Sequence, residues 1–418
     1  MKLLIVGSGG REHALAWKLS QDPRVSKIYL ASGNAGAVWL DKGEAVEGLT
    51  SIESLAQFAK NHAIDLTIVG SEALLVEGIV DYFEASGLTI FGANQKAAQL
   101  EGSKRFAKDF MKKYGVKTAA YESFTDINKA LAHLETCPYP TVVKASGLAA
   151  GKGVIICQNQ EEAILAVRSM MEDKRFGSSG NEIVIEEFLT GFECSVLSFC
   201  DGQTIALMQT AKDHKTIGEN NTGENTGGMG VVSPHPSFTD EMMLAFKRDI
   251  VEPTLHGMQQ ENMNFAGVIF FGLMVNEKGV YLLEYNMRMG DPETQAVLPL
   301  MQNSLLDPIF AALERRLTED AFVFEKNQHA VCVVVASGGY PNQYPVGFEI
   351  KHIEQARFYA QVFVAGAKYE QSALKTSGGR VLNLVGIGHH LQQARENAYS
   401  AVRQIQFEGM VYRRDIGA

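Results

Sequence analysis

The chain has 418 residues, more than one compact hydrophobic core normally supports, so its length predicts several domains. Hydrophobic residues make up 46% of the sequence and charged residues 21%, as in an ordinary globular protein. A formal net charge of −10 argues against extended binding to nucleic acid or to an anionic membrane surface.

Apolar and cysteine residues indicate the compartment. No apolar run approaches the roughly 18 residues of a membrane-spanning helix, and the opening MKLLIVGSGG resembles a strand and a glycine turn, not a signal peptide. The five cysteines form no C-x-x-C pair and lie mostly in apolar runs. We therefore expect a reduced, cytoplasmic protein without a disulfide scaffold or a zinc site.

Residues 1–102 alternate strand and helix patterns. KLLIVG at 2–7 is a continuous apolar run, typical of a parallel strand covered on both faces, and further strand patterns follow. These features predict an N-terminal doubly wound α/β domain that binds a substrate. In such sheets the loops after the strands bind ligands, here Gly7–Arg11, Ser32–Gly36, Gly70–Ala73 and Gly92–Asn94.

The first of these loops resembles a dinucleotide-binding turn but departs from it. The pattern G-x-G-x-x-G needs a glycine where this sequence has Glu12, and no acidic residue follows the second strand to bind a ribose. An NAD-dependent dehydrogenase is therefore an alternative that the motif disfavours. The amide groups at the start of the next helix can still bind one phosphate or carboxylate.

Residues 122–190 are expected to form a small α+β unit, which contains the glycine-rich stretch KASGLAAGKGV at 144–154. The spacing of its glycines is one residue too short for a P-loop, and Gly153 stands where the metal-binding hydroxyl should be. Strand patterns flank the stretch on both sides, so we predict a hairpin that closes over an anion. Lys144 and Lys152 would supply the positive charge.

Two further segments suit a nucleotide. EEFLTGFE at 186–193 ends a strand with two carboxylates, which with the backbone could bind an adenine edge, while Glu193 could accept ribose hydroxyl groups. Exposed acids at a strand end are also common without any ligand. Asp213 and Lys215, together with the run NTGGMG at 225–230, predict a second anion-binding loop.

The strongest motif is EYNMRMGDPE at 284–293, which follows an apolar strand. Residues i and i+2 of a strand share a face, so Glu284, Asn286 and Arg288 are expected to point the same way. A carboxylate and an amide oxygen suit Mg²⁺, which keeps substrate phosphates among its ligands. Arg288 could neutralise charge on a transferring phosphoryl group. A structural ion pair is the alternative interpretation.

The element patterns set the remaining boundaries. Residues 103–121 and 191–323 flank the small unit, and residues 324–418 are predicted to form a C-terminal mixed β/α domain. The chain has no internal repeat and no low-complexity linker. We therefore expect the domains to pack closely.

Together, the glycine hairpin, E-E-F-L-x-G-x-E and E-x-N-x-R on a late strand resemble the ATP-grasp fold. GSGGREHALAWKL, KASGLAAGKGV, NTGGMG and GDPETQ resemble, more specifically, the phosphoribosylamine–glycine ligase family, over essentially the whole chain. The resemblance implies that ATP phosphorylates glycine and that the amine of 5-phosphoribosylamine attacks the glycyl phosphate. It also implies Mg²⁺, which Mn²⁺ could replace, and one main ATP-grasp unit made of residues 103–121 and 191–323, with residues 122–190 as its lid. From the net charge we expect no nucleic-acid or membrane partner, and we expect a monomer or weak dimer.

The resemblance assigns roles to individual residues. ATP would be bound by Lys104, Lys144, Gly147, Gly151, Lys152, Gly153, Glu186, Glu187, Leu189 and Glu193. Glycine and the amine substrate would be bound by Gly9, Gly10, Glu72, Asp213, Asn225, Gly227, Gly228, Gly378 and Arg380. Glu284 and Asn286 would hold the metal, and the catalytic residues would be Arg288, Asp291 and Lys215.

One departure concerns the metal, because many ATP-grasp enzymes have a further acid one strand earlier. The strand pattern GVIFFGLMV at 267–275 has none, which leaves Glu284 and Asn286 as the protein ligands. A regulatory module that binds ATP without turnover is a second alternative to the ligase. The presence of both ligands and of Arg288 disfavours it.

Overall fold

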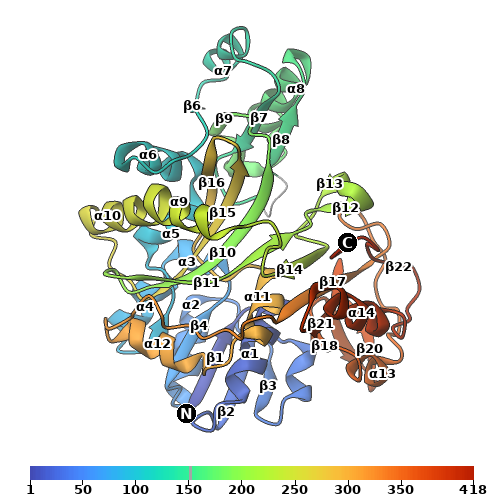
Figure 1. Ribbon diagram of the computed structural model, residues 1–418. Coiled ribbons are helices and arrows are strands. Elements are labelled where there is room, and N and C mark those ends of the chain that lie inside the picture. The colour runs from blue at the N-terminus through green and yellow to red at the C-terminus, as the bar shows by residue number, and fades with distance from the viewer. Residues whose placement is uncertain (150–152) are drawn as a thin grey trace.

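The structure, a computed structural model, describes residues 1–149 and 153–418. The N-terminal region is a five-stranded parallel sheet in the order β3-β2-β1-β4-β5, with helices on both faces (Figure 1). It is the doubly wound domain predicted from the alternating patterns. Its strands are β1 (Lys2–Val6), β2 (Lys27–Ala31), β3 (Gly43–Val46), β4 (Leu66–Val69) and β5 (Ile90–Phe91). Its helices are α1 (Gly10–Ser20), α2 (Ile52–Asn61), α3 (Glu72–Glu77), α4 (Ile79–Ala85) and α5 (Gln95–Gly102).

A nine-stranded sheet forms the centre of the molecule and continues into the C-terminal region. Its order is β16-β15-β10-β11-β14-β17-β21-β18, with β22 paired to β17, and all its pairings are antiparallel. The central strands are β10 (Phe192–Cys200), β11 (Ile205–Asp213), β14 (Gly230–Ser233), β15 (Gly267–Asn276) and β16 (Gly279–Asn286). The C-terminal ones are β17 (His329–Ser337), β18 (Gln361–Val364), β21 (Arg380–Gly388) and β22 (Met410–Val411).

A small four-stranded sheet in the order β6-β9-β7-β8 projects from the central sheet (Figure 1). Its strands are β6 (Tyr121–Phe124), β7 (Thr141–Ala145), β8 (Val154–Cys157) and β9 (Ile183–Glu187), and α7 (Ile127–Leu134) and α8 (Gln160–Met171) pack on it. β7 and β8 pair antiparallel, with Lys144 opposite Val154, so both flanks of the glycine-rich stretch are strands as predicted. Gly151 and Lys152 lie outside the described residues.

The remaining elements lie around these three sheets. Two small separate hairpins are formed by β12 (Thr216–Gly218) with β13 (Thr222–Asn225), and by β19 (Ala367–Glu370) with β20 (Ala373–Thr376). The remaining α-helices are α6 (Lys104–Tyr114), α9 (Asp240–Phe246), α10 (Glu252–Gln260), α11 (Glu293–Val297), α12 (Leu306–Leu313), α13 (Ile353–Arg357) and α14 (Leu391–Val402). A π-helical turn at Lys247–Val251 joins α9 to α10.

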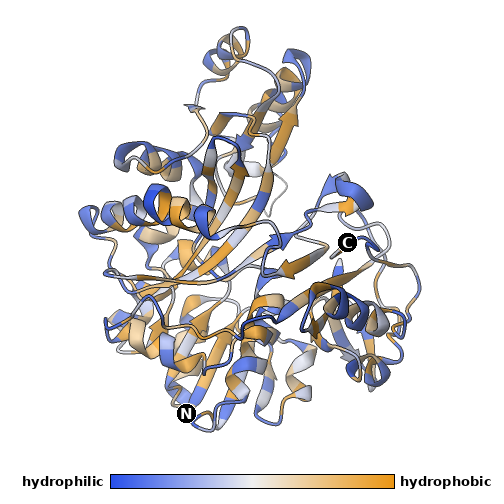
Figure 2. Cartoon of the chain, viewed as in Figure 1, coloured by the Kyte–Doolittle hydropathy of each residue, from blue (hydrophilic) through white to orange (hydrophobic). Residues whose placement is uncertain are grey.

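Hydrophobic side chains are concentrated in the strands, whereas the peripheral helices carry hydrophilic segments (Figure 2). One buried cluster joins the N-terminal region to the central sheet, where residues such as Val69 and Ala97 belong to the same core as Ile269 and Leu282. This shared core holds the ends of β1, β4 and β16 together. Among the described residues, no helix has the length and apolar character needed to cross a membrane.

Candidate active site

A cavity of about 480 Å³ lies between the small sheet, the central sheet and the loops of the N-terminal region. Most of the predicted site residues line it, although they come from distant parts of the sequence. They are Glu72, Lys104, Lys144, Gly153, Glu186, Glu187, Leu189, Glu193, Asp213, Lys215, Asn225, Gly227, Glu284, Asn286, Arg288, Asp291 and Arg380.

Other predicted residues border this cavity or lie beyond it. A Cβ atom built on Gly9 would lie 3.3 Å from Oδ2 of Asp291, and one on Gly228 would lie 2.7 Å from Oδ1 of Asp213. The absence of a side chain at these two glycines therefore lets the backbone lie close to the carboxylates of the cavity. Gly10 packs beside Asn383, Gly147 packs against Ser179, and Gly378 packs against Gly366, so these three contribute backbone shape.

One end of the cavity contains a buried carboxylate between two lysines. Oε2 of Glu186 lies 3.0 Å from Nζ of Lys144 and 3.0 Å from Nζ of Lys108. Burial alone would raise the pKa of Glu186, but the two lysine charges outweigh it and hold that pKa below its ordinary value. Oε1 of Glu186 is buried without a hydrogen-bond partner among the described residues. It is therefore an acceptor available to a ligand donor.

Lys108 was not predicted as a site residue. It lies one helical turn after Lys104 on α6, its side chain is 2% exposed, and it also donates a hydrogen bond to Oγ1 of Thr118 at 2.7 Å. Burial lowers its pKa to about 8, with Glu186 opposing the shift. The available signal was its spacing, because Lys104 and Lys108 are i and i+4 on one helix face that also lines the cavity with Ala107 and Met111.

The middle of the cavity can hold a divalent cation. The Glu284 carboxylate forms no ion pair within 4.0 Å with any described residue, yet the charges of nearby lysines overcome burial and lower its pKa. Oδ1 of Asn286 accepts a hydrogen bond from Arg288 at 3.2 Å. Within 1–149 and 153–418, no group of three or more His, Cys, Asp or Glu side chains could hold a metal. A carboxylate and an amide oxygen are donors of the kind that Mg²⁺ accepts, so Glu284 and Asn286 could supply two ligands to an ion bound mainly through substrate phosphates and water.

Lys215 and Glu193, both predicted site residues, form an ion pair at the wall of the cavity. Nζ of Lys215 lies 2.5 Å from Oε2 of Glu193, so the charge of this lysine is held beside the start of β10. Near them lie two buried acids, Asp213 and Glu293. Burial raises the pKa of both side chains, and the charge of Glu293 adds to the effect at Asp213. Oδ1 of Asp213 has no hydrogen-bond partner among the described residues, so this pair suits a ligand ammonium group.

Arg288 lies at the far end of the cavity within a network of carboxylates. Its Nη2 is 3.0 Å from Oε1 of Glu101, and its Nε is 3.7 Å from Oε2 of Glu72. Nη2 of Arg11 lies 3.9 Å from the same Glu72 oxygen, and Nη1 of Arg11 donates a hydrogen bond to the carbonyl of Met289 at 3.0 Å. Arg11 lies in the predicted ligand-binding loop Gly7–Arg11, whereas Glu101 was not predicted as a site residue. Through this network, charged side chains of the N-terminal region contact Arg288, which follows β16 of the central sheet.

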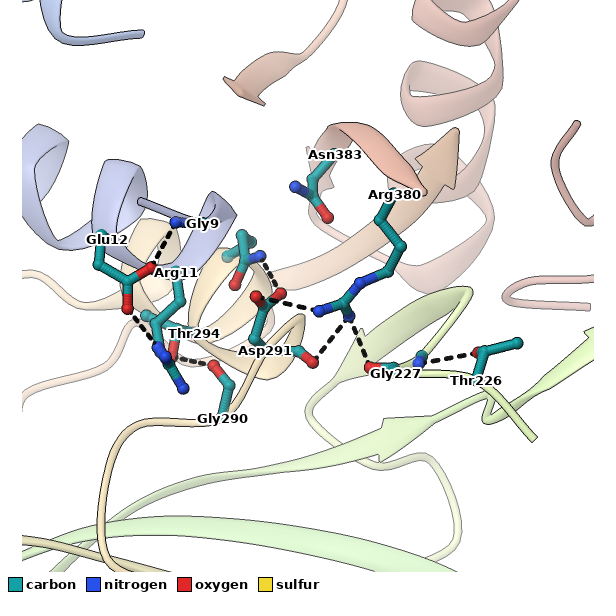
Figure 3. Close-up of polar contacts among 12 residues, drawn as sticks. Gly9, Arg11, Glu12, Thr226, Gly227, Gly290, Asp291, Thr294, Arg380 and Asn383 are labelled. Carbon is teal, nitrogen blue, oxygen red and sulfur yellow. Dashed lines mark hydrogen bonds and ion pairs between the residues drawn. The ribbon is translucent and has the colours of Figure 1, made fainter. Parts of the chain in front are cut away.

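The first glycine turn is closed by a side chain. Glu12 is 1% exposed, and its carboxylate accepts a hydrogen bond from the backbone N–H of Gly9 at 2.7 Å and another from Nε of Arg11 at 2.6 Å (Figure 3). A dinucleotide pyrophosphate would need the N–H groups at this helix start. Because Glu12 already satisfies the N–H of Gly9, this geometry counts against the dehydrogenase alternative.

The C-terminal region reaches the cavity through Arg380 at the start of β21. Its Nη2 lies 3.1 Å from Oδ2 of Asp291, and its Nη1 donates to the carbonyls of Gly227 at 2.5 Å and Asp291 at 2.9 Å (Figure 3). Gln295 donates a further hydrogen bond to Oδ1 of Asp291 at 2.7 Å. Despite burial, the charges of Arg380 and Arg11 lower the pKa of Asp291. One arginine thus fixes the glycine loop and the acid that follows β16.

The small sheet with its hairpin, the central antiparallel sheet and the cavity between them define an ATP-grasp protein. The likeness extends to the biotin carboxylase of Campylobacter jejuni, with a TM-score of 0.74 over 98% of this chain and 92% of that one, although only 14% of residues are identical. At that identity the likeness describes the fold alone.

The chain belongs to the phosphoribosylglycinamide synthetase family. Family models for its N domain, its ATP-grasp (A) domain and its C domain match residues 1–101, 102–294 and 330–418. The phosphoribosylamine–glycine ligase of Fusobacterium nucleatum is 53% identical over 100% of this chain and 98% of that protein. The solved structure of the Thermotoga maritima enzyme of the same name has a TM-score of 0.85 and 32% identity over all of both chains. A trifunctional purine biosynthetic protein of Gallus gallus is 43% identical over 100% of this chain and 42% of its own length.

Proposed function

We propose that the protein is an ATP-dependent ligase that joins glycine to 5-phosphoribosylamine in purine biosynthesis. The observation that carries this proposal is the convergence of Arg288, Asp291 and Arg380 at one end of a cavity whose other end holds the Glu186 carboxylate with its free acceptor. A nucleotide and two small substrates can therefore meet in one enclosed space. The family membership and the relatives' names support the same reaction.

The reaction has two steps. The carboxylate of glycine attacks the γ-phosphorus of ATP, the bond to the β-phosphate oxygen breaks, and ADP and glycyl phosphate form. The amine of 5-phosphoribosylamine then attacks the glycyl carbonyl, phosphate leaves, and the new amide nitrogen loses a proton. No nucleophilic side chain is required, so the protein contributes positioning and electrostatic stabilisation.

The nucleotide would occupy the end of the cavity near Glu186. The free Oε1 of Glu186 suits the exocyclic amino group of adenine, with Glu187 and Leu189 beside the base and Glu193 at the ribose. Lys104 and Lys144 would bind the phosphates together with the stretch from Gly147 to Gly153. Glu284 and Asn286 would hold Mg²⁺, which when bound neutralises phosphate charge, and Mn²⁺ can take its place.

Glycine and 5-phosphoribosylamine would lie at the other end of the cavity. Asp213 would bind the ammonium group of glycine, beside the narrow loop that contains Asn225, Gly227 and Gly228. Glu72, Gly9 and Gly10 would contact the amine substrate, and Arg380 with Gly378 would bind its phosphate. Arg288, Lys215 and Asp291 would surround the group that transfers, where Arg288 stabilises the developing negative charge.

The domain division is part of the same proposal. Residues 122–190 would close as a lid over the nucleotide, residues 103–121 with 191–323 would form the main ATP-binding unit, and residues 1–102 and 324–418 would flank it. We propose a cytoplasmic monomer or weak dimer that has neither a nucleic-acid nor a membrane partner.

The decisive assay is phosphate release with purified protein, ATP and Mg²⁺. The ligase requires that release depends on both glycine and 5-phosphoribosylamine and that glycinamide ribonucleotide accumulates in equal amount. A regulatory module would bind ATP without this dependence. Binding of a nicotinamide dinucleotide would instead favour the dehydrogenase.

A further inference from the structure

Glu101 lies where the N-terminal region meets the central sheet, as the penultimate residue of α5. Its side chain is 7% exposed and reaches the chain that follows β16. Oε1 lies 3.0 Å from Nη2 of Arg288, and Oε2 accepts a hydrogen bond from the backbone N–H of Met287 at 2.7 Å. One carboxylate therefore holds both the backbone before Arg288 and its guanidinium group.

The other contacts of Arg288 leave one of its three nitrogens, Nε, without a hydrogen-bond partner among the described residues, 3.7 Å from Oε2 of Glu72. Nη1 donates to the carbonyl of Met289 at 3.2 Å, and Nη2 also donates to Oδ1 of Asn286 at 3.2 Å. Nε is buried and has no hydrogen-bond partner among the described residues. A guanidinium group is planar, so fixing its two terminal nitrogens also fixes the direction of Nε–H. An orphan donor beside the cavity suits an anionic group of a ligand.

The distances around Arg288 favour the pairing with Glu101. Acids and bases both line the cavity, but among the ion pairs of Arg288 with described residues the one to Glu101, at 3.0 Å, is the shorter. Glu72 is more exposed and lies farther from Arg288, at 3.7 Å. Glu101 would in turn be costly to bury without Arg288, because an isolated buried carboxylate loses its hydration.

We propose that Glu101 is a positioning residue for Arg288, whose guanidinium group it holds in place at the end of the cavity where the transfer would occur. The inference rests on the proposed role of Arg288 in the ligase reaction. The competing interpretation is that Glu101 only attaches the N-terminal region to the central sheet through Met287. The two interpretations differ in whether the negative charge matters once the Met287 hydrogen bond is kept.

Glu101→Gln separates these interpretations, because a glutamine oxygen can still accept the hydrogen bond from Met287 while the negative charge opposite Arg288 is lost. Steady-state phosphate release would be measured for this variant, for Arg288→Ala and for the double variant, with thermal unfolding of each. Glu77→Gln serves as the matched control, since Glu77 is an exposed glutamate on the neighbouring helix α3. If Glu101→Gln cannot be purified, Glu101→Asp replaces it. Its shorter side chain loses reach to both Met287 and Arg288, and only a positioning role makes its effect on kcat disappear in the Arg288→Ala background.

We expect Glu101→Gln to lower kcat about tenfold or more while KM for ATP changes less than about twofold, as for other residues that orient a catalytic group. In the Arg288→Ala background the same change should have no further effect on kcat. A wild-type kcat in Glu101→Gln, or losses that multiply in the double variant, would overturn the inference. Normal turnover in Arg288→Ala would instead refute the proposed role of Arg288 itself.

Discussion

Replacing Lys108 with methionine tests the nucleotide end of the cavity. Methionine has a similar length but no charge, so Glu186 keeps only Lys144 as its partner. Removing the sole partner of a buried ion lowers the free energy of unfolding by about 3–5 kcal/mol. Because Lys144 remains 3.0 Å from Oε2 of Glu186, we expect a smaller cost, about 1.5–3 kcal/mol, as for one hydrogen bond to a charged group.

Part of this cost should appear in nucleotide binding, because Glu186 lines the cavity and its free Oε1 is the proposed acceptor for adenine. A loss of about 1.4 kcal/mol raises the Kd for ADP tenfold. Titration calorimetry with ADP measures this change directly. Lys112→Met is the control, since Lys112 lies on the same helix but is exposed.

The burial of Lys108 also predicts that ADP binding depends on pH. Burial lowers the pKa of Lys108 to about 8, so this lysine loses its proton as the pH rises through that value. The cavity then has one positive charge fewer, and the affinity for the anionic ADP should fall above about pH 8. Lys108→Met should lack that decrease. An unchanged Kd in Lys108→Met, together with the same decrease above pH 8, would refute the assigned role of Lys108.

Further substitutions and one exchange experiment test other parts of the site. Arg288→Ala should lower kcat at least about 100-fold with ADP binding retained, measured by steady-state assay and calorimetry, because the guanidinium acts on developing charge. Glu284→Gln should raise the Mg²⁺ concentration needed for half-maximal activity at least about tenfold, since one of the two protein ligands loses its charge. Gly228→Ala should cost about 1–3 kcal/mol in thermal unfolding and raise KM for glycine, because φ is +109° and the new Cβ would lie 2.5 Å from Cδ of Pro292. Amide hydrogen exchange in β7 and β8 should slow when ATP binds, and exchange that ignores ATP would contradict a closing lid.

Local patterns in the sequence were sufficient to predict part of the fold and part of the candidate site. The doubly wound sheet follows from continuous apolar runs, and the period of a strand places Glu284 and Asn286 two residues apart on the wall of one cavity. The strands on both sides of the glycine-rich stretch also distinguish it from a P-loop, which opens a helix. These features depend on neighbours in the sequence, so they can be predicted from it.

The missed residues depend on contacts across long distances in the chain. Lys108 resembles an ordinary solvent-exposed lysine of an amphipathic helix until β9 brings Glu186 to it. Glu101 contacts Met287, which is 186 positions away in the sequence. The continuation of the central sheet into the C-terminal region, through the pairing of β14 with β17, is likewise a long-range contact that no local pattern indicates.

Phosphate release measured with each substrate omitted in turn tests the ligase function most directly. With ATP and Mg²⁺ present, the ligase function predicts rapid phosphate release only when glycine and 5-phosphoribosylamine are both added, with one glycinamide ribonucleotide formed for each phosphate. Release that proceeds at the same rate without either substrate, or no release with both, would contradict it.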